Sequence, residues 1–175
     1  MFRNILVSVD GSSHSYRALE EAIDLADSNR ARLTVLTAIP KPPGWICTPM
    51  TACAAKQLEL DFEREARETL CAAVDRVPPD TPVTKILSRD SIREALRRAA
   101  KSGRYDLFVI GAGGPPARAG ARRGTAGRYV LDHCDVPVLI VHDDRNRAID
   151  ADERRDALSA PAAHGPPSHP LIARS

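Results

Sequence analysis

The residues with the most evident chemistry form a glycine-rich segment that is suited to binding phosphate. Six of the ten glycines in the 175-residue chain fall between Gly111 and Gly127. Two residues separate Gly111 from Gly114, and nine more precede Gly124 and Thr125. Glycine lets backbone amides approach an anion closely, and a helix N-terminus offers free N–H groups and the positive end of a dipole. The spacing therefore predicts a phosphate site, with Thr125 as an additional hydroxyl donor.

The charge of this segment leaves its interpretation open. It contains four arginines and no acidic residue, which gives a local charge of +4: Arg118, Arg122, Arg123 and Arg128. These side chains are able either to contact phosphates or simply to keep a surface loop hydrated. A flexible, glycine-rich surface loop is the alternative to a binding site. The segment is not a Walker A loop, because Gly-Lys-Ser/Thr does not occur in it.

A second candidate is Asp10, which ends the first apolar run of the chain in the sequence Asp10-Gly11-Ser12-Ser13. A carboxylate at the end of a strand is able to face a ligand. Position alone favours a simpler role, since aspartate is common in turns and at the start of helices. Both interpretations remain open from the sequence.

These candidates must be positioned by alternating strands and helices. Apolar, β-branched runs predict five strands, at residues 2–9, 32–39, 82–88, 106–111 and 136–142. Helical spacing of apolar residues predicts four helices. The first starts at Ser12 or Ser13, and the second spans about 51–76. The third opens at a capping box at Ser91 and closes at Gly103, and the fourth spans 125–134. The run at 106–111 is almost wholly apolar, so it is expected to be buried on both faces.

This β-α alternation predicts an α/β domain with a parallel sheet covered by helices on both faces. In such sheets ligands bind outside the carboxyl ends of the strands. The loops after Val9, Ile39 and Ile110 are therefore the expected functional loops. We expect one domain over residues 1–143 and a disordered C-terminal tail over 144–175, which is rich in charge, alanine and proline.

Composition excludes several classes of protein. Lys and Arg number 25 against 23 for Asp and Glu, so a dedicated nucleic-acid binder is not expected. No apolar run is long enough for a membrane span, and the N-terminus lacks the features of a signal peptide, so a cytoplasmic location is expected. The four cysteines match no zinc or redox spacing and are expected to be reduced thiols. A redox pair formed by Cys47 and Cys53 is the alternative.

Three blocks of sequence together resemble the universal stress protein family. The glycine spacing described above is similar to that family's ATP-binding signature. The opening NILVSVDGS resembles its first strand, DLFVIGAGG its fourth strand, and GTAGRYVLDHCDVPVLIV its closing helix and strand. The resemblance covers about residues 1–143 and leaves the tail outside.

The resemblance implies a Rossmann-like fold of five parallel strands in the order 3-2-1-4-5, and a homodimer formed through the strand at Val136–His142. For ATP-binding members it implies ATP with Mg²⁺, with adenine near the ends of the first two strands and the ribose and phosphates at the glycine segment. The residues implied are Val9, Asp10, Ala38, Gly111, Gly114, Gly124, Thr125 and the amide of Ala126. Asp10 would touch the ribose or a metal-bound water.

Two features depart from the family pattern. Pro115-Pro116 follows Gly114 directly and removes two amides from a loop that would donate them. Gly127 lies in the first turn of the last helix, where it costs about 1 kcal/mol relative to alanine.

The expected function is that of an ATP-binding, nucleotide-responsive regulatory or stress-resistance protein. Hydrolysis would be slow at most, because the sequence offers no loop lysine and no positioned base. One alternative is a dimeric scaffold of the same family that does not bind nucleotide. Another is an adenylating ATP pyrophosphatase, although the required Ser-Gly-Gly-x-Asp-Ser loop is replaced by Asp10-Gly11-Ser12-Ser13-His14-Ser15.

Overall fold

The structure is a computed structural model that describes residues 1–42, 52–112 and 125–142. The chain divides into two units, Met1–Asp143 and Asp144–Ser175. All of the described residues belong to the first unit. The expected disordered tail lies outside them.

All nine expected elements are present. The strands are β1 (Asn4–Ser8), β2 (Arg32–Ala38), β3 (Val83–Ser88), β4 (Leu107–Gly111) and β5 (Val138–Val141). The helices are α1 (Ser13–Asn29), α2 (Ala52–Val74), α3 (Ile92–Lys101) and α4 (Thr125–His133). Each strand is one to three residues shorter than its predicted run.

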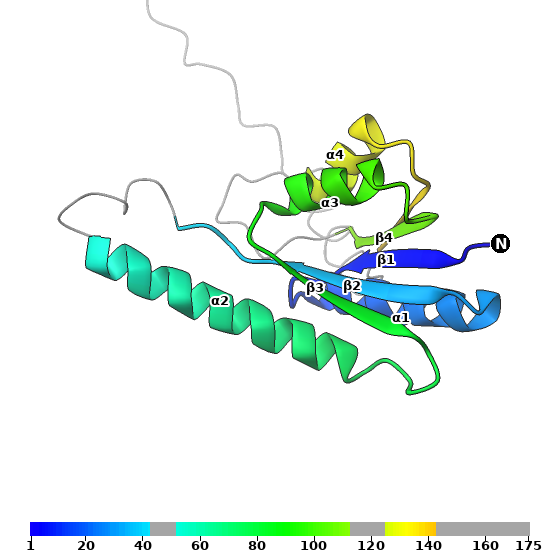
Figure 1. Cartoon of the computed structure of the whole chain (residues 1–175), viewed down its shortest axis with the longest axis horizontal. Coiled ribbons are helices and arrows are strands. Elements are labelled where there is room, and N and C mark those ends of the chain that lie inside the picture. The colour runs from blue at the N-terminus through cyan, green and yellow to red at the C-terminus, as the bar shows by residue number, and fades with distance from the viewer. Residues whose placement is uncertain (43–51, 113–124, 143–175) are drawn as a thin grey trace, which may run out of the picture. The chain divides into compact units, whose positions relative to one another are not determined.

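The five strands form one parallel sheet in the order β3-β2-β1-β4-β5, as expected (Figure 1). β1 is central, and its residue Leu6 pairs with Thr34 of β2 and Phe108 of β4. β5 is an edge strand, paired with β4 alone among the described elements. The order means that the chain reverses direction across the sheet between β1 and β4, which is where ligands bind in this architecture.

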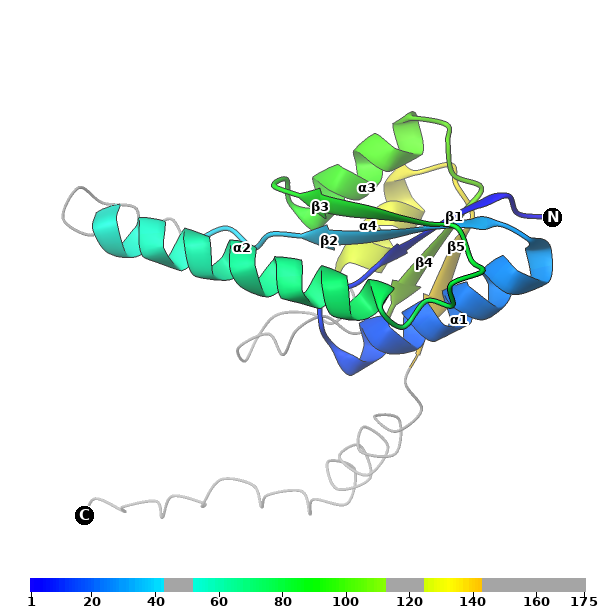
Figure 2. The same ribbon diagram turned by 60° about the horizontal axis from the view of Figure 1, so that its bottom comes forward.

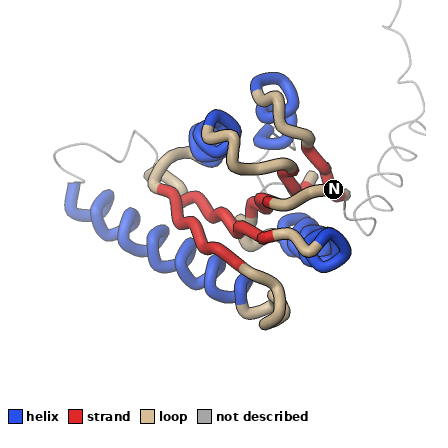
Figure 3. The backbone as a smooth tube through the Cα atoms, turned by 45° about the vertical axis from the view of Figure 1, so that its right-hand side comes forward, coloured by secondary structure: helices blue, strands red, loops and turns tan. Residues whose placement is uncertain are grey.

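Helices cover both faces of the sheet, as Figures 2 and 3 show. Side chains from α1 and α2 pack in one aliphatic cluster with Val7 and Val109, and side chains from α3 and α4 pack in a second with Leu6 and Phe108. β4 contributes alternate residues to the two clusters and is buried along its whole length. The expectation that this strand is buried on both faces is therefore confirmed.

Helix ends follow the capping chemistry that the sequence predicts. Ser12 caps α1, and its Oγ accepts a hydrogen bond from the Ser15 amide at 3.2 Å. Ser91 caps α3 and accepts from the Glu94 amide at 3.4 Å. The Glu94 carboxylate accepts from Arg97, so the described residues show only one half of the expected capping box. Gly103 follows α3 with a φ of +63°, as expected for a residue that ends a helix.

α2 is covered along only part of its length. Ala66, Leu70 and Ala73 are buried against the sheet, whereas Leu60 is 54% exposed. Leu58 is half-buried. In Figure 1 the N-terminal part of α2 extends past the carboxyl ends of the strands. Within the described residues, no helix combines the length and apolarity that a membrane crossing requires.

Asp106 ties the start of β4 to the start of β1. One of its carboxylate oxygens accepts from the amides of Arg3 and Asn4 at 2.8 and 2.9 Å, and these bonds hold the pKa of Asp106 below its usual value. A carboxylate with a lowered pKa in the folded state stabilises the protein above its unfolded-state pKa. That stabilisation is lost as the pH falls through the folded-state pKa.

We therefore expect Asp106→Asn to lower the free energy of unfolding at pH 7, and the difference from wild type to shrink below about pH 4. Urea denaturation at several pH values measures both. Asp80→Asn, in an exposed turn, removes the same charge without these amide bonds and serves as the control. A difference for Asp106→Asn that stays constant down to pH 2.5 (roughly 1.5 pH units below an ordinary aspartate pKa) contradicts the assignment.

Candidate functional site

The register of the sheet brings the strand ends together at one edge. The Val9 amide donates to the Leu36 carbonyl at 2.9 Å, so the residue after β1 lies beside the end of β2. Ser8 pairs with Ile110, so the same end of β1 lies beside the end of β4. The carboxyl edge therefore unites Asp10, Ala38 and Gly111, three of the residues that the sequence singles out.

At this edge Asp10 is exposed and ordered by its own turn. Its Oδ1 accepts from the Ser12 amide at 3.0 Å and from the Ser12 hydroxyl at 2.6 Å. The Asp10 amide donates to the hydroxyl of Ser15, a buried residue, at 3.3 Å. Asp10 thus has the turn role that its position favours. Its Oδ2 makes no hydrogen bond to the described residues.

Gly111 is required by close packing between β4 and α1. A β-carbon at this position would lie 2.6 Å from the carbonyl oxygen of His14 and 2.9 Å from the Ser15 nitrogen. Both are backbone atoms in the first turn of α1, which have little freedom to move away. The glycine therefore has a packing role, and this role places the backbone at the end of β4 against the N-terminus of α1.

The first turn of α4 lies over the ends of β4 and β5. A β-carbon on Gly127 would stand 3.4 Å from Ile140 Cδ1 and 3.9 Å from Ile110 Cγ2. Ala126 is half-buried in the same region. The N-terminus of α4 is thus near Gly111, where its dipole favours an anion.

Several expected site residues lie outside the described residues. They are Gly114, Gly124, the side chain of Thr125, and three of the four segment arginines, Arg118, Arg122 and Arg123. The fourth, Arg128, has a side chain that is 84% exposed, with its Nε 3.9 Å from Asp132 one helical turn away. That pairing favours a solvated helix surface over a phosphate contact for Arg128.

The described residues contain no group of three or more His, Cys, Asp or Glu side chains that could hold a metal ion. A single carboxylate such as Asp10 is still compatible with Mg²⁺, which keeps several waters and is commonly held by substrate phosphates. Cys134 is partly buried, which raises the pKa of its thiol. Cys47, one member of the alternative redox pair, lies outside the described residues, and Cys53 is exposed.

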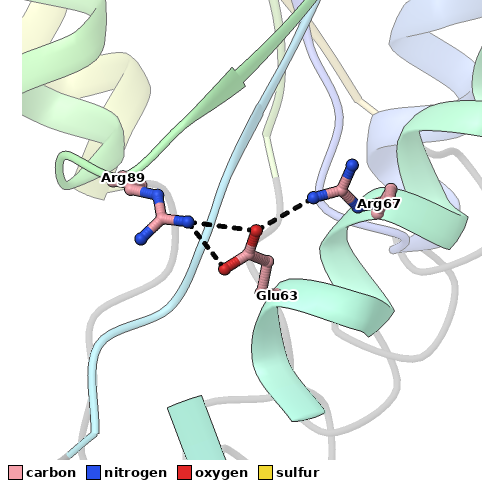
Figure 4. Close-up of polar contacts among 3 residues, drawn as sticks. All are labelled: Glu63, Arg67 and Arg89. Atoms are coloured by element: carbon pink, nitrogen blue, oxygen red, sulfur yellow. Dashed lines mark hydrogen bonds and ion pairs between the residues drawn. The ribbon is translucent and has the colours of Figure 1, made fainter. Parts of the chain in front are cut away.

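Two contacts at this edge involve residues that were not predicted from the sequence to lie at the site. Thr69 of α2 approaches Gly11, where a β-carbon would lie 3.5 Å from the threonine hydroxyl. Glu63 of α2 binds Arg89, which follows β3 (Figure 4). The sequence could have indicated Ser15, because it stands three residues after the Ser12 cap. Glu63 and Arg89 are 26 residues apart, and no local sequence pattern links them.

The fold and this edge define an α/β protein with a glycine-bearing carboxyl edge at the point where strand order reverses. The model of the universal stress protein family matches residues 1–142, and the chain belongs to that family. A universal stress protein of Thermus aquaticus, encoded in the QAH/OAS sulfhydrylase 3′ region, is 30% identical over 141 residues, which cover 81% of this chain and 99% of the relative.

Solved structures have the same fold. The universal stress protein UspA of Lactobacillus plantarum has a TM-score of 0.63 and 24% identity, covering 79% of this chain and 97% of its own. A universal stress protein solved in complex with cAMP has a TM-score of 0.52 and 27% identity, covering 81% and 97%. Both similarities support the observed fold.

The two glycines near the edge are expected to respond oppositely to alanine. Gly111→Ala should destabilise the protein by about 1–3 kcal/mol, because the methyl group meets immovable backbone. Gly127→Ala should be tolerated or stabilising by up to about 1 kcal/mol, because its methyl group meets only a side chain at ordinary contact distance. Urea denaturation of the two variants measures the difference. Equal stability of both variants contradicts the packing role of Gly111.

Proposed function

We propose that this universal stress protein binds ATP with Mg²⁺ and acts as a nucleotide-responsive regulatory protein in the cytoplasm. The observation that carries the proposal is the carboxyl edge itself, where Asp10, Ala38 and Gly111 meet beside the first turn of α4. The related protein solved with cAMP supports nucleotide binding by a similar chain.

The base would lie at the ends of β1 and β2. The side chain of Val9 is packed in the core, so at this edge it would offer its backbone rather than its side chain. Ala38 is half-buried and small, which leaves room for a flat ring against the strand end. Asp10 would use its Oδ2 for the ribose or a metal-bound water.

The phosphates would lie between Gly111 and the start of α4, with Gly114, Gly124, Thr125 and the Ala126 amide as further donors. Helix N-termini favour such anions. The glycine-rich segment offers no lysine, and Asp10 is the one carboxylate in the turn that follows β1. Hydrolysis would therefore be slow at most, and bound ATP would act by favouring one conformation or assembly.

ATP binding is tested by thermal unfolding with and without Mg-ATP, since a ligand that binds only the folded state raises the melting temperature. We expect a rise for wild type, and none for Gly124→Val, whose side chain would obstruct the phosphate loop. Gly103→Asn, placed after α3 and away from the edge, is the control for a changed glycine, because asparagine tolerates the positive φ of this position. An unchanged melting temperature for wild type at saturating ATP favours the scaffold alternative, for which Pro115-Pro116 is the supporting feature. Release of pyrophosphate from ATP would instead favour the adenylating enzyme.

The proposed assembly is a homodimer formed through Val136–His142. β5 ends the described sheet, and an edge strand with unpaired backbone groups is able to pair with a second copy. Large apolar side chains lie exposed on this strand and on the helix before it, with Leu139 37% and Leu131 54% exposed.

A charge on this edge should oppose the assembly. We expect sedimentation equilibrium to give a dimer for wild type and a monomer for Leu139→Lys at micromolar concentration. Leu60→Lys, on the exposed part of α2, is the control and should leave the mass unchanged. A monomeric wild type contradicts the proposed dimer.

A further inference from the structure

A cluster of three charged side chains connects α2 to the end of β3 (Figure 4). Nη2 of Arg89 donates to both carboxylate oxygens of Glu63, at 2.9 and 3.2 Å. Arg67, one turn further along α2, donates to the same carboxylate at 2.9 Å. The Glu63 side chain is only 22% exposed, against 76% for Arg89. The carboxylate is therefore shielded, whereas most of the Arg89 side chain faces solvent.

Arg89 lies next to the end of β2. It directly follows Ser88, which pairs with Ala38 in the parallel register. The Ser88 carbonyl also accepts from the Ile39 amide at 2.8 Å, so the chain leaving β2 stays beside the residue that precedes Arg89. In Figure 4 that chain passes between the backbones of α2 and Arg89, so the ion pair spans it. Arg89 thus occupies the next position along the same edge as Asp10 and Ala38.

The strand order sets the direction in which a bound base would point. A nucleotide with its phosphates at β4 and its ribose at β1 directs its base across β2 toward β3. Neighbouring strands are only about 4.8 Å apart, so a two-ring purine that starts at β2 reaches the end of β3. A one-ring pyrimidine in the same position stops short of it.

The guanidinium of Arg89 is suited to meet that base. It is planar and carries five N–H groups, of which only those on Nη2 are committed to Glu63 within the described residues. The remaining donors match ring nitrogen acceptors on a purine edge, and the planar group also stacks on a base. Because the long side chain is held by a shielded carboxylate, less of its conformational freedom is left to lose on binding.

We propose that Arg89 contacts the base of the bound nucleotide and gives the site its preference for purines, with Glu63 as the residue that positions it. This inference rests on the proposed nucleotide site and names the residue that reads the far edge of the base. Arg67 shares the carboxylate but comes from α2 itself, one turn nearer the C-terminus of that helix, and it has no part in base contact.

The test compares affinities for Mg-ATP and Mg-CTP by isothermal titration calorimetry, because the two ligands carry the same triphosphate. Wild type should prefer ATP. Arg89→Ala should weaken ATP about tenfold, as expected for loss of one hydrogen bond from a charged donor, and should leave CTP unchanged. Arg89→Lys should recover little of the preference, because lysine lacks the planar group. Glu63→Gln should reduce the preference partly, and Arg67→Ala should keep it.

The outcomes separate this inference from the proposed function. If wild type binds neither nucleotide, the proposed function fails and the inference with it. If wild type binds ATP and Arg89→Ala keeps the wild-type ratio of ATP to CTP affinity, the inference fails while the nucleotide site stands. A loss of preference in Arg67→Ala equal to that in Arg89→Ala also overturns the inference, because the effect would then belong to the ion pairs in general. Urea denaturation of each variant ensures that all compared proteins are folded.

Discussion

The close approach of β4 to the first turn of α1 is the constraint on which the carboxyl edge depends. At Gly111 there is no room for a side chain, because the His14 carbonyl and the Ser15 amide occupy the place of a β-carbon. The contact fixes how far α1 stands from β4. Since Ser15 also binds the Asp10 amide, the same contact sets where the Asp10 turn lies. The glycine whose spacing resembles a ligand-binding signature is therefore a structural necessity here.

The central position of β1 extends this constraint across the sheet. β1 pairs with β2 on one side and β4 on the other, so a displacement of either neighbour is transmitted to the Asp10 turn. Buried aliphatic side chains fill both faces and give the strands little freedom to slide. A shift of register by one residue would turn Val7 from one core to the other, so the two clusters disfavour such a slip.

Much of this arrangement was predictable from the sequence, because it depends on local patterns. Five apolar runs, the Ser12 and Ser91 caps and the terminating Gly103 gave the elements and their order. The resemblance to universal stress proteins added the strand order, which periodicity alone does not contain. Asp10 and Ala38 were expected at one edge, and the register brings them there.

The packing role of Gly111 was not predictable, because it depends on the distance between two elements separated by most of the chain. For the same reason nothing in the sequence indicated the Glu63–Arg89 pair.

The incomplete cover of α2 divides the helix into two parts that are held differently. Beyond Ala66 it is anchored by side chains sealed against the sheet. Around Asp61 the side-chain hydrogen bonds among the described residues lie within the helix itself, between Gln57 and Asp61 and between Arg64 and Asp61, both exposed pairs of small net value. The first part can therefore fray from its N-terminal end without opening the core, at a cost well below that of global unfolding. The Glu63–Arg89 pair stands at the boundary between the two parts. Fraying of the N-terminal end of α2 is therefore a low-energy motion that stops at the edge of the sheet.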